Sequence, residues 1–319
     1  MKKVYLAALS LLSLFAAFYF YNKYSVDCYS VGIVVPIEHQ ALTEMVDGFL
    51  QKMKSLELEK PVRVVVQNAN GSSSEMRAIV ESFKSSKFDV IIPVTASATM
   101  LAVGLEQKTP IIGLASRPNV VDRRVAKNLV TICDEVSPCL HAEFIKSTFP
   151  FCNKICVLHS CSEYILDDVK ELTISAKELG VAVEGFMVQS LVDLSAQLQH
   201  LPQDCDVIFI FKDSLMASAA SMISSAAKNL KKPFVSVDQG SAKVGAGLAM
   251  GVVEREVGEV GAECVARILK KQPVQDIQMQ ERLHIFWNKK HLSSDEFDEA
   301  SLQAFAMNHG FVVEELTWF

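Results

Sequence analysis

Apolar and polar positions alternate between two patterns from about residue 30 onward. Short runs rich in β-branched residues lack the polar alternation of a half-exposed strand, which is typical of strands buried on both faces of a sheet. Nine runs of this kind predict strands at 31–37, 62–69, 89–95, 110–116, 154–160, 181–188, 206–212, 233–238 and 246–252.

Segments with apolar residues at helical spacing lie between these runs. Ser72 and Glu75 form a capping box ahead of one helix, Ser137 followed by Pro138 opens another, and Gly180 supplies a C-terminal stop. The glycine-rich segment 240–247 is interpreted as a tight connection. The predicted helices span 42–54, 76–85, 97–106, 138–149, 164–179, 215–230 and 254–271, with a further capped helix ending at Gly310.

Strands that alternate with helices predict right-handed βαβ units and parallel sheets. Nine strands are too many for one doubly wound domain with this number of helices. The alternation of strands and helices also begins a second series near 137–154. The sequence therefore predicts an α/β protein of two Rossmann-like lobes joined by a hinge. Residues 30–136 are expected to form lobe 1, with part of 238–285 returning to it. Residues 137–237 are expected to form lobe 2, with part of 286–319.

An apolar helix is expected ahead of the lobes. Lys2 and Lys3 lead into an uncharged run over 4–21, and eighteen helical residues reach roughly 27 Å, near the thickness of a bilayer's hydrocarbon core. Residues 1–27 are therefore predicted to be a signal peptide or a membrane anchor. Aromatic residues stand where a cleavage site needs small ones, which slightly favours the retained anchor. Lipid modification of Cys28 is a third alternative, and the small-residue box it requires is missing.

Charge and cysteine content exclude some partners. The formal net charge is −6 and no long basic run is present, so no nucleic-acid partner is expected. Cys152, Cys156 and Cys161 lie close together, but their spacing is not the paired CxxC of a zinc site. Buried free thiols are the favoured interpretation, with Cys133–Cys139 and Cys152–Cys161 as alternative disulfides.

The sequence lacks the motifs of an enzyme. No GxSxG elbow, no P-loop and no GxGxxG after the first strand are present. Glu38 beside His39 suggests acid–base chemistry, but a single histidine in a strand–helix loop is more often a polar contact. We expect no catalytic residue, no metal ligand and no cofactor.

Small polar residues follow the predicted strands, and ligands of open parallel sheets bind at those carboxyl ends. Thr95, Ala96 and Ser97 lead into a helix, whose free N–H groups and dipole suit a carboxylate. Asp213 and Asp238 on the facing lobe suit an ammonium group, so the pair of sites indicates a zwitterion such as an amino acid. Helix capping would explain each of these hydroxyl residues taken one at a time. Their concentration at one edge of the predicted sheets favours a role in ligand binding. The candidate ligand-binding residues are Glu38, His39, Thr95, Ala96, Ser97, Ser116, His159, Ser160, Asp213, Ser214 and Asp238.

Several segments, in order, resemble the ABC-transporter substrate-binding proteins of the tryptophan/tyrosine-type group. VGIVVPIEHQALTEMVDGFLQ resembles the family's strand, "EHPAL" loop and helix, and VVVQNANGSSSEM resembles its "QNAQGD" segment. SVDQGSAKVGA is the most specific match, since it closely follows "SDEGSVKKGA". The similarity spans roughly residues 31–285. It implies the type I periplasmic binding protein fold and an exported protein that delivers a small ligand, often an amino acid, to an ABC permease in the inner membrane.

The resemblance also implies that hydroxyls and amides at the strand ends hold the ligand's carboxylate, while Asp213 holds its amine. Three segments depart from the family. Where the family has "PTDN", this chain has FKDS, so Lys212 replaces threonine and Ser214 replaces asparagine. Where the family has "YNPSE", the chain has HSCSE, so His159 and Ser160 replace tyrosine and asparagine. The family's "VTDP" segment is SRPN here. Tryptophan specificity is therefore not carried over. A periplasmic protein, anchored by residues 4–21, is the expectation, and a membrane-tethered sensor of the same fold without a transport role is the alternative.

Overall fold

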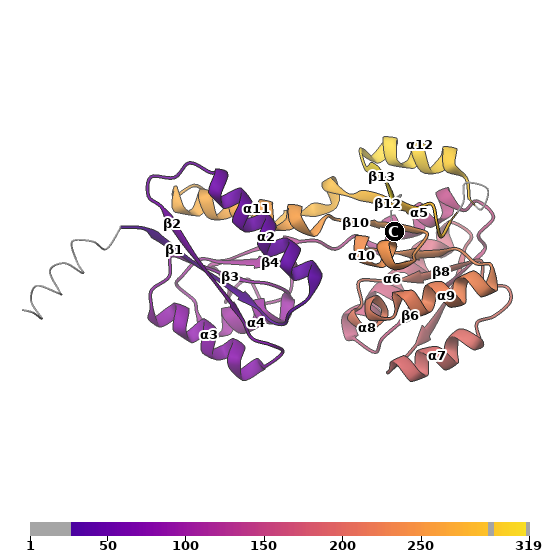
Figure 1. The fold of residues 1–319 in the computed structure, drawn as a ribbon, viewed down its shortest axis with the longest axis horizontal. Coiled ribbons are helices and arrows are strands. Elements are labelled where there is room, and N and C mark those ends of the chain that lie inside the picture. Colours follow the sequence, from indigo (N-terminus) through magenta and orange to yellow (C-terminus); the bar gives the residue numbers. More distant parts are fainter. Residues whose placement is uncertain (1–26, 293–296, 317–319) are drawn as a thin grey trace, which may run out of the picture.

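Two β-sheets, each covered by helices on both faces, make up the protein (Figure 1). The computed structural model describes residues 27–292 and 297–316. We call the sheet that contains the first strands, with its helices, lobe 1, and the second sheet with its helices lobe 2. The strands of lobe 1 are β1 (Tyr29–Val35), β2 (Val62–Asn68), β3 (Val90–Pro93), β4 (Ile111–Leu114), β5 (Leu129–Cys133) and β11 (Ile277–Gln278), and its helices are α2 (Gln40–Ser55), α3 (Ser73–Ser85), α4 (Ala96–Leu105) and α11 (Glu254–Leu269).

Lobe 2 repeats this architecture with a longer sheet. Its strands are β6 (Lys154–His159), β7 (Ala182–Met187), β8 (Val207–Ile210), β9 (Phe234–Ser236), β10 (Leu248–Gly251), β12 (His284–Asn288) and β13 (Val312–Leu316). Its helices are α5 (Pro138–Thr148), α6 (Glu163–Glu178), α7 (Leu191–Gln199), α8 (Ser214–Ser218), α9 (Ala220–Leu230), α10 (Gln239–Val244) and α12 (Glu299–His309). The strand orders are β11-β5-β4-β3-β1-β2 in lobe 1 and β13-β12-β10-β9-β8-β6-β7 in lobe 2. All pairings between named strands are parallel except that of β10 with β12.

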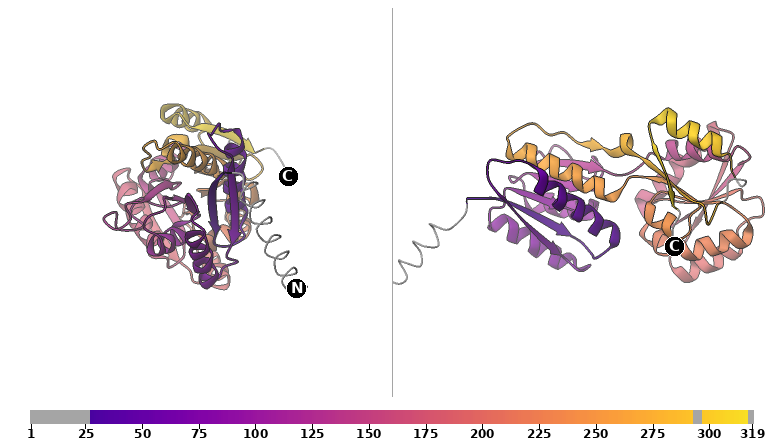
Figure 2. Two further views of the ribbon diagram at one scale, coloured as in Figure 1. Left: turned by 90° about the vertical axis from the view of Figure 1, so that its left-hand side faces the viewer. Right: turned by 45° about the horizontal axis from the view of Figure 1, so that its top comes forward.

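The chain passes between the lobes three times within the described residues, at 134–137, 252–253 and 279–283 (Figure 2). The first passage leads from β5 into α5, the second from β10 into α11, and the third from β11 through a short 3-10 turn, Met279–Arg282, into β12. Buried residues of both lobes join in one continuous apolar cluster. The three crossovers therefore form the natural hinge of the molecule.

Helix α11 returns to lobe 1 and packs against α2 on one face of the sheet, while α3 and α4 cover the other face (Figure 1). The two helices approach closely because glycines face backbone at their crossing. A Cβ at Gly258 would overlap the backbone carbonyl of Met45, and a Cβ at Gly48 would overlap that of Arg255. The contact fixes the segment that follows the second crossover.

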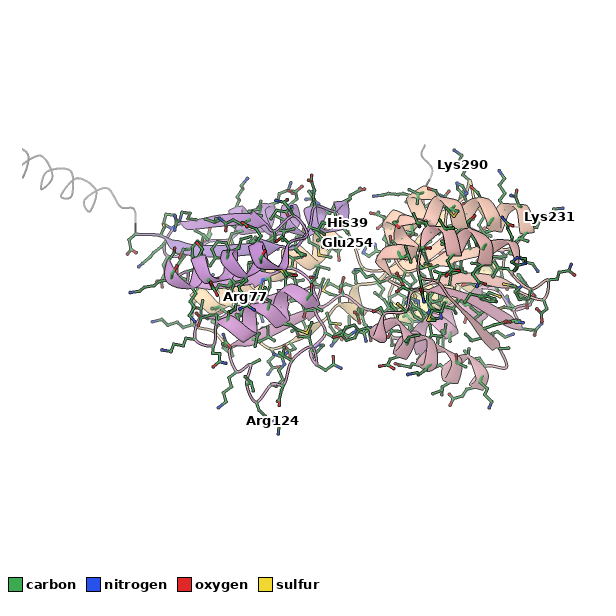
Figure 3. The ribbon with its side chains drawn as sticks, turned by 90° about the horizontal axis from the view of Figure 1, so that it is seen from below. His39, Arg77, Arg124, Lys231, Glu254 and Lys290 are labelled. Carbon is green, nitrogen blue, oxygen red and sulfur yellow. The ribbon has the colours of Figure 1, made fainter. Side chains whose placement is uncertain are left out.

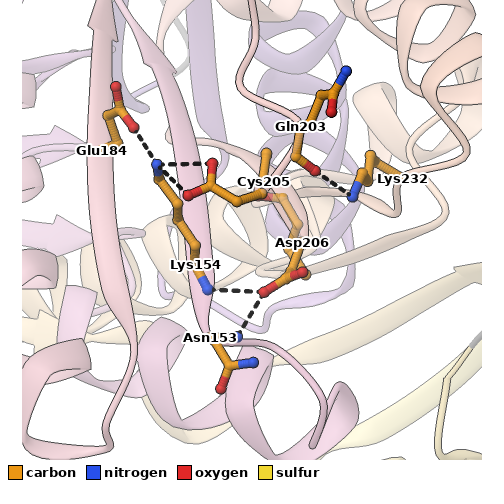
Figure 4. Close-up of polar contacts among 9 residues, drawn as sticks. Asn153, Lys154, Glu184, Gln203, Cys205, Asp206 and Lys232 are labelled. Atoms are coloured by element: carbon orange, nitrogen blue, oxygen red, sulfur yellow. Dashed lines mark hydrogen bonds and ion pairs between the residues drawn. The ribbon is translucent and has the colours of Figure 1, made fainter.

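A charged cluster fixes the start of β6 in lobe 2 (Figure 4). The Lys154 ammonium lies 2.6 Å from Glu184 of the neighbouring β7 and 3.1 Å from Asp204. A carboxylate oxygen of Asp206 accepts hydrogen bonds from the backbone N–H of Asn153 at 2.8 Å and of Lys154 at 3.0 Å. These contacts set the register of β6 between β7 and β8, the strands whose carboxyl ends lead toward the other lobe.

The predicted α/β fold with two parallel-sheet lobes is confirmed, and all nine predicted strands are present. The capping predictions are also confirmed, since Ser72 Oγ accepts from the Glu75 N–H at 3.2 Å and Ser137 Oγ from the Leu140 N–H at 3.3 Å. The strands β5, β11 and β12 were not predicted. The helix predicted over 215–230 is divided at Ala219 into α8 and α9.

Two further interpretations differ from the structure. The tight connection expected over 240–247 is wrong, because Asp238 caps α10 there and Gly245, at φ 141°, ends it. All eight cysteines are free thiols, so neither alternative disulfide forms: Cys133 and Cys152 are buried while Cys139 and Cys161 are exposed. The apolar run 4–21 lies outside the described residues, and no helix among those described is long and apolar enough to cross a membrane.

We expect Gly258→Ala to lower the thermal stability of the protein, because the added methyl group cannot be accommodated without moving two backbones. A loss of about 1–3 kcal/mol is typical of overpacking in a well-packed core. Gly104→Ala is the matched control: it lies in α4 with nothing within 4 Å of the added Cβ, and alanine in a helix is favoured over glycine by about 0.5–1 kcal/mol. Thermal unfolding followed by circular dichroism should show a decrease for the first variant and no decrease for the second.

Candidate ligand-binding site

A cavity of about 440 Å³ lies between the two lobes. Its walls come from the N-terminus of α4 and the loop after β4 in lobe 1, from the crossover 134–137, and from α5, α6 and the loops after β6, β8 and β9 in lobe 2. This volume falls in the range of about 300–1,000 Å³ that small-molecule sites occupy. The position matches the general rule that parallel sheets bind ligands at the carboxyl ends of their strands.

Two helices present uncapped N-termini at this cavity. Ala96 begins α4 and lines the cavity, and the preceding Thr95 makes no side-chain cap. Ser162 precedes α6, lines the cavity and likewise makes no side-chain cap. Thr95, at φ 85°, and Ala115, at φ 50°, occupy the left-handed region just after β3 and β4, and such strain concentrates at functional sites. Free N–H groups and the positive ends of two helix dipoles suit an anionic ligand group.

Asp213 supplies a carboxylate on the lobe 2 side of the cavity. Its side chain caps α8 by accepting from the Leu215 N–H at 2.9 Å, and its second oxygen accepts from the Ser160 N–H at 2.7 Å. The residue is buried. Oδ1 also accepts from the Met216 N–H at 3.4 Å. These contacts hold the carboxylate in place, and Oδ2, which accepts from one donor, retains a lone pair for another.

Lys212 joins lobe 2 to two of the crossovers. Its ammonium forms an ion pair with Asp134 of the first crossover and lies 3.7 Å from Glu254, which follows the second. Burial lowers the pKa of Lys212, but the attraction of these carboxylates outweighs it and raises the pKa above its usual value. Burial also raises the pKa of Glu254, and Lys212 opposes that increase.

Arg117 bridges the lobes at the edge of the cavity. From the loop after β4 it donates to both oxygens of Asp168 on α6, at 2.8 and 3.1 Å, and it pairs with Glu135 of the first crossover. Its guanidinium lies 5.7 Å from the centre of the Tyr164 ring. Burial and the neighbouring Asp134 raise the pKa of Glu135 to about 7 although Arg117 lowers it. Burial likewise raises the pKa of Asp168.

His141, in the second turn of α5, lines the interior of the cavity. Its ring packs against Phe209 and Phe211, with centroids 5.3 and 6.2 Å apart. Burial lowers the pKa of His141 to about 3, so the ring is neutral. Its Nδ1 has no hydrogen-bond partner, and a buried polar group left unpaired costs about 1–3 kcal/mol.

The structure brings three of the residues predicted from the sequence, Ala96, Ser160 and Asp213, to the cavity. Thr95 and Ser97 hydrogen bond to each other at 3.1 Å beside it. The side chain of Ser214 lies outside what the structure describes. The residues Arg117, His141 and Lys212 line the cavity and were not among the predicted site residues. Arg117 lies in the SRPN segment and Lys212 in the FKDS segment, and the departure of these segments from the family could have indicated both residues.

The other predicted residues do not line this cavity. Glu38 is exposed, and His39 caps α2 by accepting from the Ala41 N–H at 3.2 Å. His39 and Glu254 lie on the side of lobe 1 that faces lobe 2 (Figure 3). Two further residues make contacts elsewhere: His159 bonds through Nδ1 to the Ser160 carbonyl, and Asp238 caps α10. Ser116 is buried, and its hydroxyl is unpaired.

Comparison with known proteins identifies the family. The profile of ABC transporter substrate binding proteins matches residues 30–297. The chain belongs to this family. The resemblance predicted from the sequence motifs is therefore confirmed, and the protein is the substrate-binding component of an ABC transporter. Proteins of this family bind small solutes outside the cytoplasm rather than transforming them.

Individual relatives are distant in sequence. A tyrosine-binding protein of Clostridioides difficile (strain R20291) is 23% identical over 265 residues, covering 78% of this chain and 74% of that protein. An uncharacterised protein of Rickettsia prowazekii (strain Madrid E) is 25% identical over 286 residues, covering 89% of this chain and 91% of that protein.

Among the described residues, no group of three or more His, Cys, Asp and Glu side chains is placed to hold a metal ion.

Solved structures share the fold. An ABC domain from Streptococcus pneumonia in complex with L-Trp superposes with a TM-score of 0.70 at 19% identity, covering 87% of this chain and 98% of that chain. The ligand-free, open structure of a substrate-binding protein from Clostridium difficile gives a TM-score of 0.70 at 21% identity, covering 91% and 100%. Both confirm the type I periplasmic binding protein fold for this substrate-binding protein.

We expect Arg117→Ala to loosen the placement of the lobes relative to each other, because Asp168 of lobe 2 and Glu135 of the first crossover lose their common cation. Small-angle X-ray scattering of the ligand-free protein should show a larger radius of gyration, and ligand affinity should fall about tenfold, which corresponds to about 1.4 kcal/mol. Arg124→Ala is the control, since Arg124 is 90% exposed and pairs only locally with Asp122. Equal scattering curves for wild type and Arg117→Ala would contradict this role.

The pKa of Glu135, about 7 against an ordinary value of 4.5, predicts a pH dependence. The folded protein favours the protonated form, so this stability is present below about pH 4.5 and is lost as the pH rises through 7. Since the side chain is 37% exposed, screening limits the effect to about 1 kcal/mol, or about 2–4 °C. Thermal melts of wild type and Glu135→Gln from pH 5 to 8 should diverge, with wild type losing stability relative to the variant. Divergence in the opposite direction would show that the ion pair with Arg117 dominates.

Proposed function

We propose that this substrate-binding protein serves an ABC importer and closes its two lobes around a small zwitterion, an amino acid or a close relative. The observation that carries the proposal is the pairing, within one interlobe cavity, of two uncapped helix N-termini with the carboxylate of Asp213. Such a pairing suits a ligand that carries a carboxylate and an ammonium group a few bonds apart.

The ligand's carboxylate is assigned to the N-termini of α4 and α6. Ala96 belongs to lobe 1 and Ser162 to lobe 2, and both line the cavity. A carboxylate between them accepts backbone hydrogen bonds from both lobes. Such an anion favours closure, because it satisfies donors that the open protein leaves to water.

The ligand's ammonium is assigned to Asp213, the position that the family resemblance implies for the amine. Asp134, Glu135 and Asp168 also line the cavity, but each already pairs with Lys212 or Arg117. Asp213 accepts only backbone N–H groups among the described residues. Support also comes from the relatives, since one is a tyrosine-binding protein and one solved neighbour holds L-Trp.

Closure is expected to be a hinge motion at the three crossovers, which presents both lobes together to the permease in the inner membrane. Export to the periplasm, with residues 4–21 as signal or anchor, completes this proposal. The substitution of Lys212 for the family's usual threonine places an ion pair with Asp134 at the hinge, so the ligand is expected to differ from those of the named relatives.

We expect Asp213→Asn to weaken binding of an amino acid at least tenfold, because a desolvated ammonium loses its charged partner while the α8 cap is retained. Isothermal titration calorimetry of the full chain in detergent, against a panel of L-amino acids, measures the change. Asp238→Asn is the matched control, since Asp238 also caps a helix, α10, through its carboxylate and does not line the cavity. No heat and no thermal shift with any amino acid would contradict the proposed ligand class.

A further inference from the structure

Negative charge exceeds positive charge around the interlobe cavity. Each of the two cations that line it, Lys212 and Arg117, is shared by two carboxylates, and Asp213 pairs with neither cation. A ligand whose ammonium and carboxylate groups cancel leaves this excess unchanged. The five carboxylates concerned are Asp134, Glu135, Asp168, Asp213 and Glu254.

Glu135 offers this cavity a carboxylate oxygen without a partner. The residue lines the cavity from the first crossover, and its side chain is 37% exposed. Arg117 pairs with Oε2 of Glu135 and donates to both oxygens of Asp168. Oε1 of Glu135 accepts no hydrogen bond from any described side chain, since Arg117 is its residue's one side-chain partner. This oxygen is therefore available to a donor on the ligand.

An exposed aromatic ring lies beside Glu135. Tyr164, in the first turn of α6, lines the cavity and is 48% exposed. The guanidinium of Arg117 lies 5.7 Å from the centre of that ring while it pairs with the two carboxylates. The protein's own side chain thus shows that this corner of the cavity holds a cation. Carboxylates and the faces of aromatic rings together favour ammonium and guanidinium groups.

The protonation of Glu135 reflects the same shortage of positive charge. Burial raises its pKa to about 7, and Asp134 and Asp168 add to the increase although Arg117 opposes it. Near pH 7, about half of the Glu135 side chains therefore carry a proton. A ligand cation would displace that proton, because a nearby positive charge favours the ionised form of a carboxyl group.

We propose that Glu135 is a specificity-determining residue that binds a second cationic group, at the end of the ligand's side chain, so that the cavity selects basic amino acids over neutral ones. This inference rests on the proposed function, because it assumes that Asp213 and the two helix N-termini hold the ligand's α-ammonium and carboxylate groups. It adds the chemical class of the ligand's side chain.

The test compares amino acids that differ by one cationic group. Wild type, Glu135→Gln and Glu171→Gln, all as full chains in detergent, are titrated by calorimetry with two pairs of ligands. L-norleucine is L-lysine without its side-chain amine, and L-citrulline is L-arginine with a neutral urea group in place of the guanidinium. Glutamine keeps the size of the Glu135 side chain without its charge. Glu171 is the control residue, because it is exposed on the turn of α6 after Asp168 and lines a neighbouring groove rather than the cavity.

In wild type and Glu171→Gln, the cationic member of at least one pair should bind about tenfold more tightly, or better, than its neutral partner. In Glu135→Gln this preference should fall below about threefold, through weaker binding of the cationic member only. Titrations at pH 7 in buffers of different ionisation enthalpy should show that wild type releases up to about half a proton with the cationic member and none with the neutral one. The release should disappear in Glu135→Gln, which a purely structural role for this residue would not produce.

Amino-acid binding without a preference for the cationic members in wild type would overturn the inference and leave the proposed function intact. An equal preference in wild type and Glu135→Gln would do the same, as would binding of the cationic members without proton release. Absence of binding to every amino acid would contradict the proposed ligand class itself, and with it this inference.

Discussion

The ion pairs of Lys212 with Asp134 and Glu254 connect the segments on which the two lobes turn. Asp134 is 3% exposed and Glu254 is 6% exposed, and a buried carboxylate without a partner destabilises a protein by several kcal/mol. The cation that compensates them comes from lobe 2, although both carboxylates stand at the ends of lobe 1 elements. The charge balance at two of the three crossovers therefore depends on one side chain.

This arrangement gives the crossovers a preferred geometry without making them rigid. The side chain of Lys212 is 38% exposed, so water can reach it when the lobes separate. Arg117 acts in the same way at the edge of the cavity, where it reaches Asp168 of lobe 2 and Glu135 of the crossover. Ion pairs that exchange with water at little net cost suit a protein that opens and closes repeatedly.

Local patterns made much of the fold predictable. Runs buried on both faces and helix caps such as Ser72 and Ser137 are signals that lie within a few residues of sequence. The connections between strands then place the carboxyl ends of the parallel strands at one edge of each sheet. Strands β5 and β12 were not predicted, although they are longer than the predicted β3 and β4. The site was predicted less completely, because its contacts join residues that are far apart in the sequence. Arg117 and Asp168 are 51 residues apart, and Lys212 and Asp134 are 78 apart.

The same limit explains why Ala96, Ser160 and Asp213 reach the cavity while Asp238 does not. All follow strands, but the direction of each side chain depends on how the lobes face one another, which only the crossovers determine. Four carboxylates and two cations are found among the described residues that line the cavity. Burial is the main cause of the raised pKa of Glu135, and the neighbouring carboxylates Asp134 and Asp168 add to it. A ligand with two carboxylates would add to this excess of negative charge. A single carboxylate is tolerated because two helix N-termini supply positive potential without a formal charge, and an accompanying ammonium reduces the excess at Asp213. The electrostatics of the cavity thus favour a zwitterion over a simple anion.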